Sequence, residues 1–134
     1  MKKLDSYVSN LAVLERASGQ DLSNEFVASG IISKFSAQFE LAWKLLKATL
    51  AYEGVAEAAS GSPRQILKAA YGAYGFLDEG LWLEMLQARN DLAHLYDGEA
   101  VQRLVRRIID AYTPEFQELQ RQLEALYGES LFAE

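Results

Sequence analysis

Apolar residues recur three or four positions apart along most of this chain, the spacing that places them on one face of an α-helix. This pattern predicts a first helix over residues 4–17 and a longer second helix over residues 24–52. Asp21 or Ser23 is expected to cap the second helix, and Gly54 is expected to end it. The apolar seam of the second helix is predicted to be buried: Ile32, Phe35, Phe39, Ala42, Trp43, Leu46 and Leu50.

Polar side chains on the second helix are expected to lie outside this seam. Glu40 and Lys44 are one helical turn apart, which favours a solvated ion pair between them. Lys44 and Lys47 are expected on other sides of the helix from Trp43, which is interpreted as a core residue.

The second half of the chain contains clear signals for helix starts. Ser62–Pro63 combines a hydroxyl cap with proline at the first helical position, so a third helix is expected to begin there. Asp78 is expected to cap a fourth helix. A turn at Asp97–Gly98 precedes the last helical region, in which Thr113–Pro114 predicts a break or kink with Thr113 capping the renewed helix. Short loops between amphipathic helices favour an all-α, up-and-down bundle of four to five helices.

Composition agrees with one helical domain over residues 1–134. The chain has no cysteine and one histidine, which excludes a disulfide framework, a thiolate metal site and a zinc site built from several histidines of one chain. No cofactor and no metal are therefore expected. Neither a signal peptide nor an apolar run of ~18 residues is recognisable, so we expect a cytoplasmic protein without a membrane anchor.

The formal net charge of −6 argues against a general nucleic-acid-binding protein, because phosphate contacts require a basic surface. A brief catalytic encounter with RNA, or a basic protein partner, remains compatible with this charge. The densest basic patch is formed by Arg103, Arg106 and Arg107, which suits either a phosphate, an acidic partner surface or a plain solvent-exposed face.

Arg89 and His94 are the residues most suggestive of chemistry. Arginine binds phosphate oxygens through a planar fork, and histidine exchanges a proton near neutral pH. Together they suffice for metal-free cleavage of an RNA phosphodiester, with histidine in proton transfer and arginine stabilising the charged transition state.

The spacing of this pair leaves two geometries open. Five residues on an ideal helix separate the two side chains by about 140°, whereas Arg89 and Tyr96 would share a face. Either the helix ends near His94 and rearranges, or two copies of the segment face each other across a homodimer. A structural interpretation is also open: Arg89 lies on an otherwise apolar stripe and pairs with a carboxylate, and His94 interacts with helix-terminal carbonyls.

The segment Arg89–His94 (RNDLAH) resembles the Arg-x4-6-His motif of HEPN domains, helical proteins of which many are dimeric, metal-independent ribonucleases. Tyr96 extends the likeness to the Arg-x4-His-x-Tyr form of HEPN toxins that are paired with a minimal nucleotidyltransferase antitoxin. More of the chain resembles the nucleotidyltransferase substrate-binding protein family. The matching landmarks, in order, are Phe35–Lys44, Ser62–Arg64, Asp78–Trp82, Arg89–Tyr96, and Tyr112 with Phe116.

The resemblance implies a dimeric bundle that binds a separate small nucleotidyltransferase. It implies catalytic roles for Arg89 and His94, supporting roles for Asn90 and Asp91, and transfer of AMP to Tyr96 by the partner. The chain is thus predicted to be the helical subunit of a two-protein nucleotidyltransferase system, as a HEPN-like toxin or a substrate-binding component. The alternatives are an autonomous, metal-independent HEPN ribonuclease with RNA as substrate, and a structural subunit that presents a small substrate to the transferase.

Overall fold

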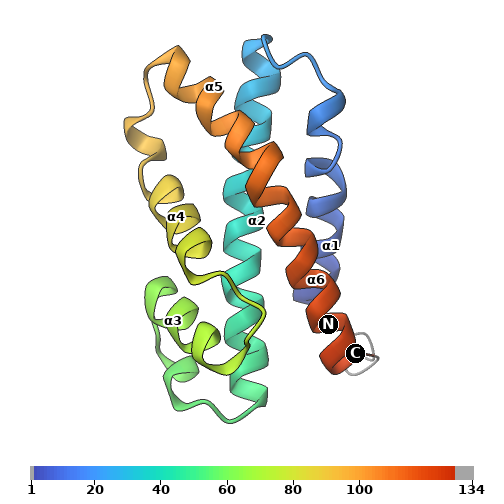
Figure 1. The fold of residues 1–134 in the computed structure, drawn as a ribbon, viewed down its shortest axis with the longest axis vertical. Coiled ribbons are helices and arrows are strands. Elements are labelled where there is room, and N and C mark those ends of the chain that lie inside the picture. The colour runs from blue at the N-terminus through green and yellow to red at the C-terminus, as the bar shows by residue number, and fades with distance from the viewer. Residues whose placement is uncertain (1, 129–134) are drawn as a thin grey trace.

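A computed structural model describes residues 2–128 and shows an all-α architecture in this range (Figure 1). The π-helical turn Ile108–Tyr112 joins the last two α-helices without interruption, so they form one continuous rod. The predicted bundle of four to five helices is therefore confirmed. The α-helices are α1 (Lys2–Leu14), α2 (Glu25–Tyr52), α3 (Pro63–Ala73), α4 (Glu79–Asn90), α5 (Gly98–Arg107) and α6 (Thr113–Tyr127).

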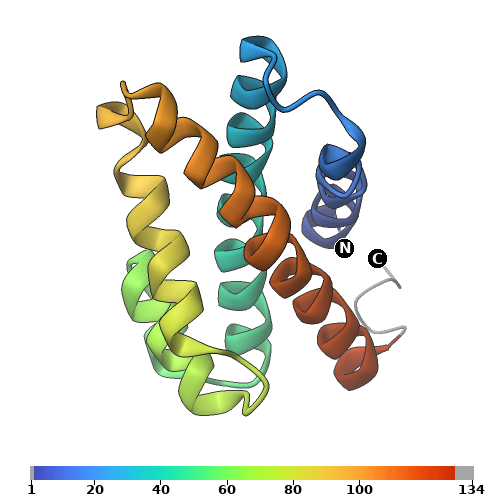
Figure 2. The same ribbon diagram turned by 45° about the horizontal axis from the view of Figure 1, so that its top comes forward.

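The long helix α2 is the centre of the bundle. It packs against α1, α3, α4 and α5, while α6 packs against α1. In Figure 1, α1 lies on one side of α2, and α3 and α4 lie on the other. The turned view in Figure 2 shows the α5–α6 rod crossing α2 diagonally. No helix in residues 2–128 is long and apolar enough to cross a membrane.

An aromatic cluster occupies the place where α2, α4 and the α5–α6 rod meet. Phe35 stacks on Tyr112 with ring centroids 5.2 Å apart, and Trp82 meets Phe116 edge-to-face at 5.7 Å. The predicted seam of α2 is largely confirmed, because its members other than Ile32 and Trp43 are buried. Ile32 and Trp43 are only partly buried, since they lie at the edge of the seam.

Short polar side chains cap most of the helices. Ser62 forms a capping box with Gln65, and Asp78 accepts a hydrogen bond from the first turn of α4, as the sequence predicts. The cap of α2 is Asn24, so the prediction of Asp21 or Ser23 is wrong. The Asp21 carboxylate instead accepts hydrogen bonds from the backbone and hydroxyl of Ser23, which closes a turn before the helix.

Of the break or kink predicted at Thr113–Pro114, the break does not occur. The rod stays helical because the wider π-helical turn before Thr113 rearranges the backbone bonding just where Pro114 offers no N–H donor. Thr113 has helical dihedral angles (φ −60°, ψ −47°) and does not act as a cap. The prediction of Thr113 as the cap of a renewed helix is therefore wrong.

Candidate functional site

The segment that follows α4 leaves the helical path before His94. Helix α4 ends at Asn90, and Leu92–His94 form a single 3₁₀ turn in which the His94 amide donates to the Asp91 carbonyl at 2.9 Å. The chain then runs without regular structure to Asp97, whose side chain caps α5 by accepting from the Glu99 amide at 3.0 Å. The helix therefore ends and rearranges before His94, and the other geometry left open by the sequence, two copies facing each other across a homodimer, stays a prediction.

The end of α4 also changes the position of Tyr96. An i, i+7 relationship on a continuous helix would place Tyr96 beside Arg89 on an apolar stripe. Because α4 stops at Asn90, that relationship does not apply, and Tyr96 is 86% exposed. The expected shared face of Arg89 and Tyr96 is therefore wrong.

Arg89 is held inside the bundle by α2. Its Nη1 lies 2.6 Å from Oε1 of Glu40, and its side chain is 26% exposed. The guanidinium lies over the ring of Phe39, 5.6 Å from the centroid, a distance typical of a cation–π contact. Its buried Nε has no hydrogen-bond acceptor among residues 2–128. These contacts match the structural interpretation of Arg89, an arginine on an apolar stripe that pairs with a carboxylate between helices.

Glu40 also belongs to this site, as the ion-pair partner of Arg89, a contact that the sequence did not predict. Its Oε2 accepts a hydrogen bond from Nε1 of Trp43 at 3.1 Å and lies 3.8 Å from Nζ of Lys44. The predicted pair with Lys44 is thus present, but the closest contact of Glu40 is with Arg89. The available signal was the charge of Arg89 on an apolar stripe, which requires a carboxylate somewhere on a facing helix.

The other residues of the motif are at the surface. Asn90, Asp91 and His94 are exposed, and the Asp91 carboxylate accepts a hydrogen bond from Gln87 at 2.9 Å. In the part of the chain that the structure describes, no hydrogen bond or ion pair joins Arg89 to His94. A single chain therefore offers an exposed imidazole and an exposed phenol two residues apart along the chain, while Arg89 is paired with Glu40.

We searched the described residues for a cluster of side chains that could bind a metal ion. Among the described residues, no three histidine, aspartate or glutamate side chains come together in a way that could hold an ion. The chemistry that the motif offers is proton transfer by His94 and nucleophilic attack by the phenol of Tyr96.

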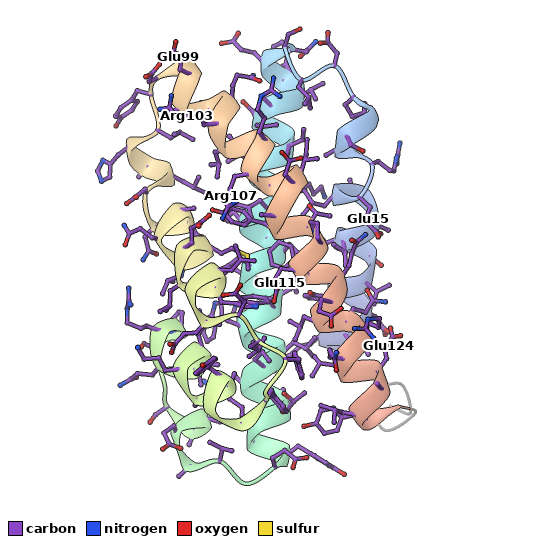
Figure 3. All side chains as sticks on the ribbon, viewed as in Figure 1. Glu15, Glu99, Arg103, Arg107, Glu115 and Glu124 are labelled. Atoms are coloured by element: carbon purple, nitrogen blue, oxygen red, sulfur yellow. The ribbon has the colours of Figure 1, made fainter. Side chains whose placement is uncertain are left out.

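A second polar cluster joins α4 to the α5–α6 rod. Arg107 binds the Glu84 carboxylate in a bidentate manner, with N···O distances of 2.6 and 2.9 Å, and the Tyr112 hydroxyl donates to the same carboxylate at 2.6 Å. In Figure 3, Arg107 and Glu115 are labelled where the rod faces α4. Arg107 is thus committed to Glu84, and Arg103 lies 3.8 Å from Glu99, which leaves Arg106 as the member of the predicted basic patch without an ion pair among residues 2–128.

Glu84 should make the stability of the fold depend on pH. The hydrogen bonds from Arg107, and then that from Tyr112, hold the pKa of Glu84 below its usual range. A lowered folded-state pKa adds stability that is present above the unfolded pKa and disappears as pH falls through the folded value. Because Glu84 is 42% exposed, solvent screening limits the expected loss in Glu84→Gln to about 1 kcal/mol at pH 7.

Urea unfolding at pH 7 and at acidic pH tests this expectation. The free energies of unfolding of the wild type and Glu84→Gln should converge as the pH falls below the folded-state pKa of Glu84. A constant difference between the two proteins at all pH values would contradict the assignment.

Comparison of the sequence with known proteins assigns the chain to a family. A search among curated proteins finds no match. The sequence profile described as nucleotidyltransferase substrate binding protein like matches residues 2–125, which include the whole Arg89–Tyr96 segment and nearly all of the bundle. This range confirms the resemblance that the ordered landmarks indicate. The chain belongs to the nucleotidyltransferase substrate binding protein-like family.

Proposed function

We propose that this chain is the helical partner of a separate small nucleotidyltransferase and presents Tyr96 to that enzyme as an acceptor of AMP. The family description supports an association with a nucleotidyltransferase. The observation that carries the proposal is the 86% exposure of Tyr96 on the short irregular segment between α4 and α5. An irregular exposed segment can enter another enzyme's active site without unfolding the bundle.

The other tyrosines of the chain are less suited to this role. Four of the seven have their hydroxyl groups engaged in hydrogen bonds inside the fold: Tyr7, Tyr74, Tyr112 and Tyr127. Tyr52 and Tyr71 are also exposed, but both belong to regular helices. Tyr96 combines high exposure with a position outside any regular helix, and it lies two residues from His94 along the chain.

The transfer is chemically simple. The phenolic oxygen of Tyr96 attacks the α-phosphorus of ATP, the bond to the β-phosphate oxygen breaks, pyrophosphate leaves, and the phenolic proton passes to solvent. The product is a phosphodiester with one negative charge on the tyrosine. Arg89 is already paired with Glu40, so the nearest group along the chain with which the new phosphate could interact is the imidazole of His94.

Intact-mass measurement tests the proposal. The purified chain is incubated with a small nucleotidyltransferase, ATP and magnesium. We expect a mass increment of one AMP on the wild type and on Tyr52→Phe, a control at another exposed tyrosine, and none on Tyr96→Phe. An unmodified wild type, or an increment that survives in Tyr96→Phe, would refute the assignment.

The autonomous ribonuclease stays the alternative function. It requires Arg89 to leave Glu40, or a second chain to bring its own His94 to the same phosphate, because Arg89 is engaged within one chain. The expected homodimer stays a prediction; within one chain Glu40 already provides Arg89 with a counter-charge. Purified chain tested on RNA in a chelator, with His94→Ala as control, separates this alternative from the partner role.

A further inference from the structure

A groove with three lysines lies along the second half of α2, and one of these lysines, Lys44, is 3.8 Å from Glu40. It is bordered by the first turn of α1, the second half of α2 and the 3₁₀ turn Ala56–Ala59, and its volume is about 500 Å³. Lys3, Lys44 and Lys47 line it together with Trp43 and four alanines. We name these residues the lysine groove. The sequence-based expectation that Lys44 and Lys47 lie on other sides of α2 from Trp43 is wrong, because all three line this groove.

The charge of the lysine groove contrasts with the charge of the chain. Three lysines and no carboxylate line it, in a protein with a formal net charge of −6. Lys3 and Lys47 form no ion pair within residues 2–128. The adjacent Glu40 carboxylate is already engaged by Arg89 and Trp43, and its oxygen is 3.8 Å from Lys44. Like charges gathered in a concave site favour an anionic ligand.

Trp43 gives the lysine groove an aromatic wall with a fixed orientation. The indole is only partly buried, and its Nε1 donates to Glu40 at 3.1 Å, which restrains the ring. Nζ of Lys44 lies 5.9 Å from the ring centroid, so a cation and an aromatic surface are adjacent. The four alanines line the rest of the groove with small apolar side chains. An aromatic face beside ammonium groups suits a ligand that joins a planar ring to phosphates.

We propose that the lysine groove binds a free nucleotide, with the base stacked on Trp43 and the phosphates on the three lysines. Its volume is in the range of small-ligand sites. This site goes beyond the proposed function, because it needs neither Tyr96 nor a transferase. Glu40 contacts Arg89 on one side and Trp43 and Lys44 on the other, so the occupied groove and the end of α4 share one carboxylate.

Titration of the purified chain with ATP tests this inference without any partner protein. Calorimetry gives the affinity, and tryptophan fluorescence reports the stacked base, because Trp43 is partly exposed whereas Trp82 is buried. We expect ATP to quench the fluorescence of the wild type. The double variant Lys44→Gln/Lys47→Gln should bind at least about tenfold more weakly, as expected for lost charge-assisted contacts. Lys34→Gln, on the same helix but outside the groove, should bind ATP like the wild type.

Two further ligands identify what the groove recognises. Tripolyphosphate should bind more weakly than ATP to the wild type, and Trp43→Leu, checked for folding by circular dichroism, should remove this difference. Absence of ATP binding at millimolar concentration, or binding that the double lysine variant leaves intact, would overturn the proposal. A single-stranded RNA that binds more tightly than ATP, with the same dependence on Lys44 and Lys47, would assign the groove to RNA and overturn the free nucleotide.

Discussion

Trp82→Ala is expected to lower the free energy of unfolding by about 3–5 kcal/mol, the largest effect of any single substitution that we propose. Trp82 is 1% exposed, and its indole contacts Phe39 of α2 at 6.3 Å and Phe116 of α6 at 5.7 Å between ring centroids. The substitution therefore opens a cavity where α2, α4 and the α5–α6 rod meet. For a chain of this length the melting temperature should fall by roughly 10–20 °C.

The hydrogen bond of Trp82 can be separated from its packing. Nε1 donates to Oε1 of Glu115 at 3.0 Å, and burial raises the pKa of this carboxyl. Trp82→Phe keeps an aromatic ring but leaves the Glu115 carboxylate without this donor, so a smaller loss of about 1–2 kcal/mol is expected. Urea unfolding followed by circular dichroism measures both variants. A loss below about 1 kcal/mol in Trp82→Ala would contradict a shared core at this point.

Local signals in the sequence located the helices well. Ser62 and Asp78 act as caps because capping needs only a short polar side chain and the amides of the next turn. The cap of α2 was misplaced because Asp21, Ser23 and Asn24 compete within four positions, and the turn closed by the first two leaves Asn24 as the cap. Spacing alone could not rank these three.

The region of Thr113 shows that a local sequence signal does not by itself predict whether a helix breaks. Proline predicts a missing backbone donor, but whether the helix breaks depends on the residues before it and on what they pack against. Here Ile108 and Tyr112 are buried in the core on either end of the π-helical turn, so a rearranged but continuous rod retains more packing than a break would.

The candidate site was located by its motif, but its geometry was not predictable. The sequence left open where α4 ends, and that position decides whether Tyr96 shares a face with Arg89 or stands exposed. The Arg89–Glu40 contact joins two helices that are far apart along the chain. Helical periodicity shows which side of a helix is apolar, but it does not show which residue of another helix lies opposite.

A double-mutant cycle on Arg89 and Glu40 should measure how strongly this contact holds α4 on α2. Arg89→Met alone leaves the Glu40 carboxylate without its closest positive charge. Glu40→Leu alone leaves the Arg89 guanidinium without its negative partner. Each substitution should cost about 2–3 kcal/mol, because both side chains are mostly buried, at 26% and 32% exposure. The double variant should cost less than the sum of the two, with a coupling energy of about 1–2 kcal/mol from urea unfolding.

The same double variant separates folding from chemistry. Since it removes both charges together, it should stay folded while lacking the guanidinium that an Arg-x4-His ribonuclease needs. We expect this folded variant to accept AMP on Tyr96 as the wild type does, because Arg89 contacts α2 and the exposed segment carries the acceptor. A coupling energy below about 0.5 kcal/mol would contradict the structural role of the pair. A folded variant that accepts no AMP, when Lys34→Gln does, would instead place the Arg89–Glu40 pair in the transfer itself.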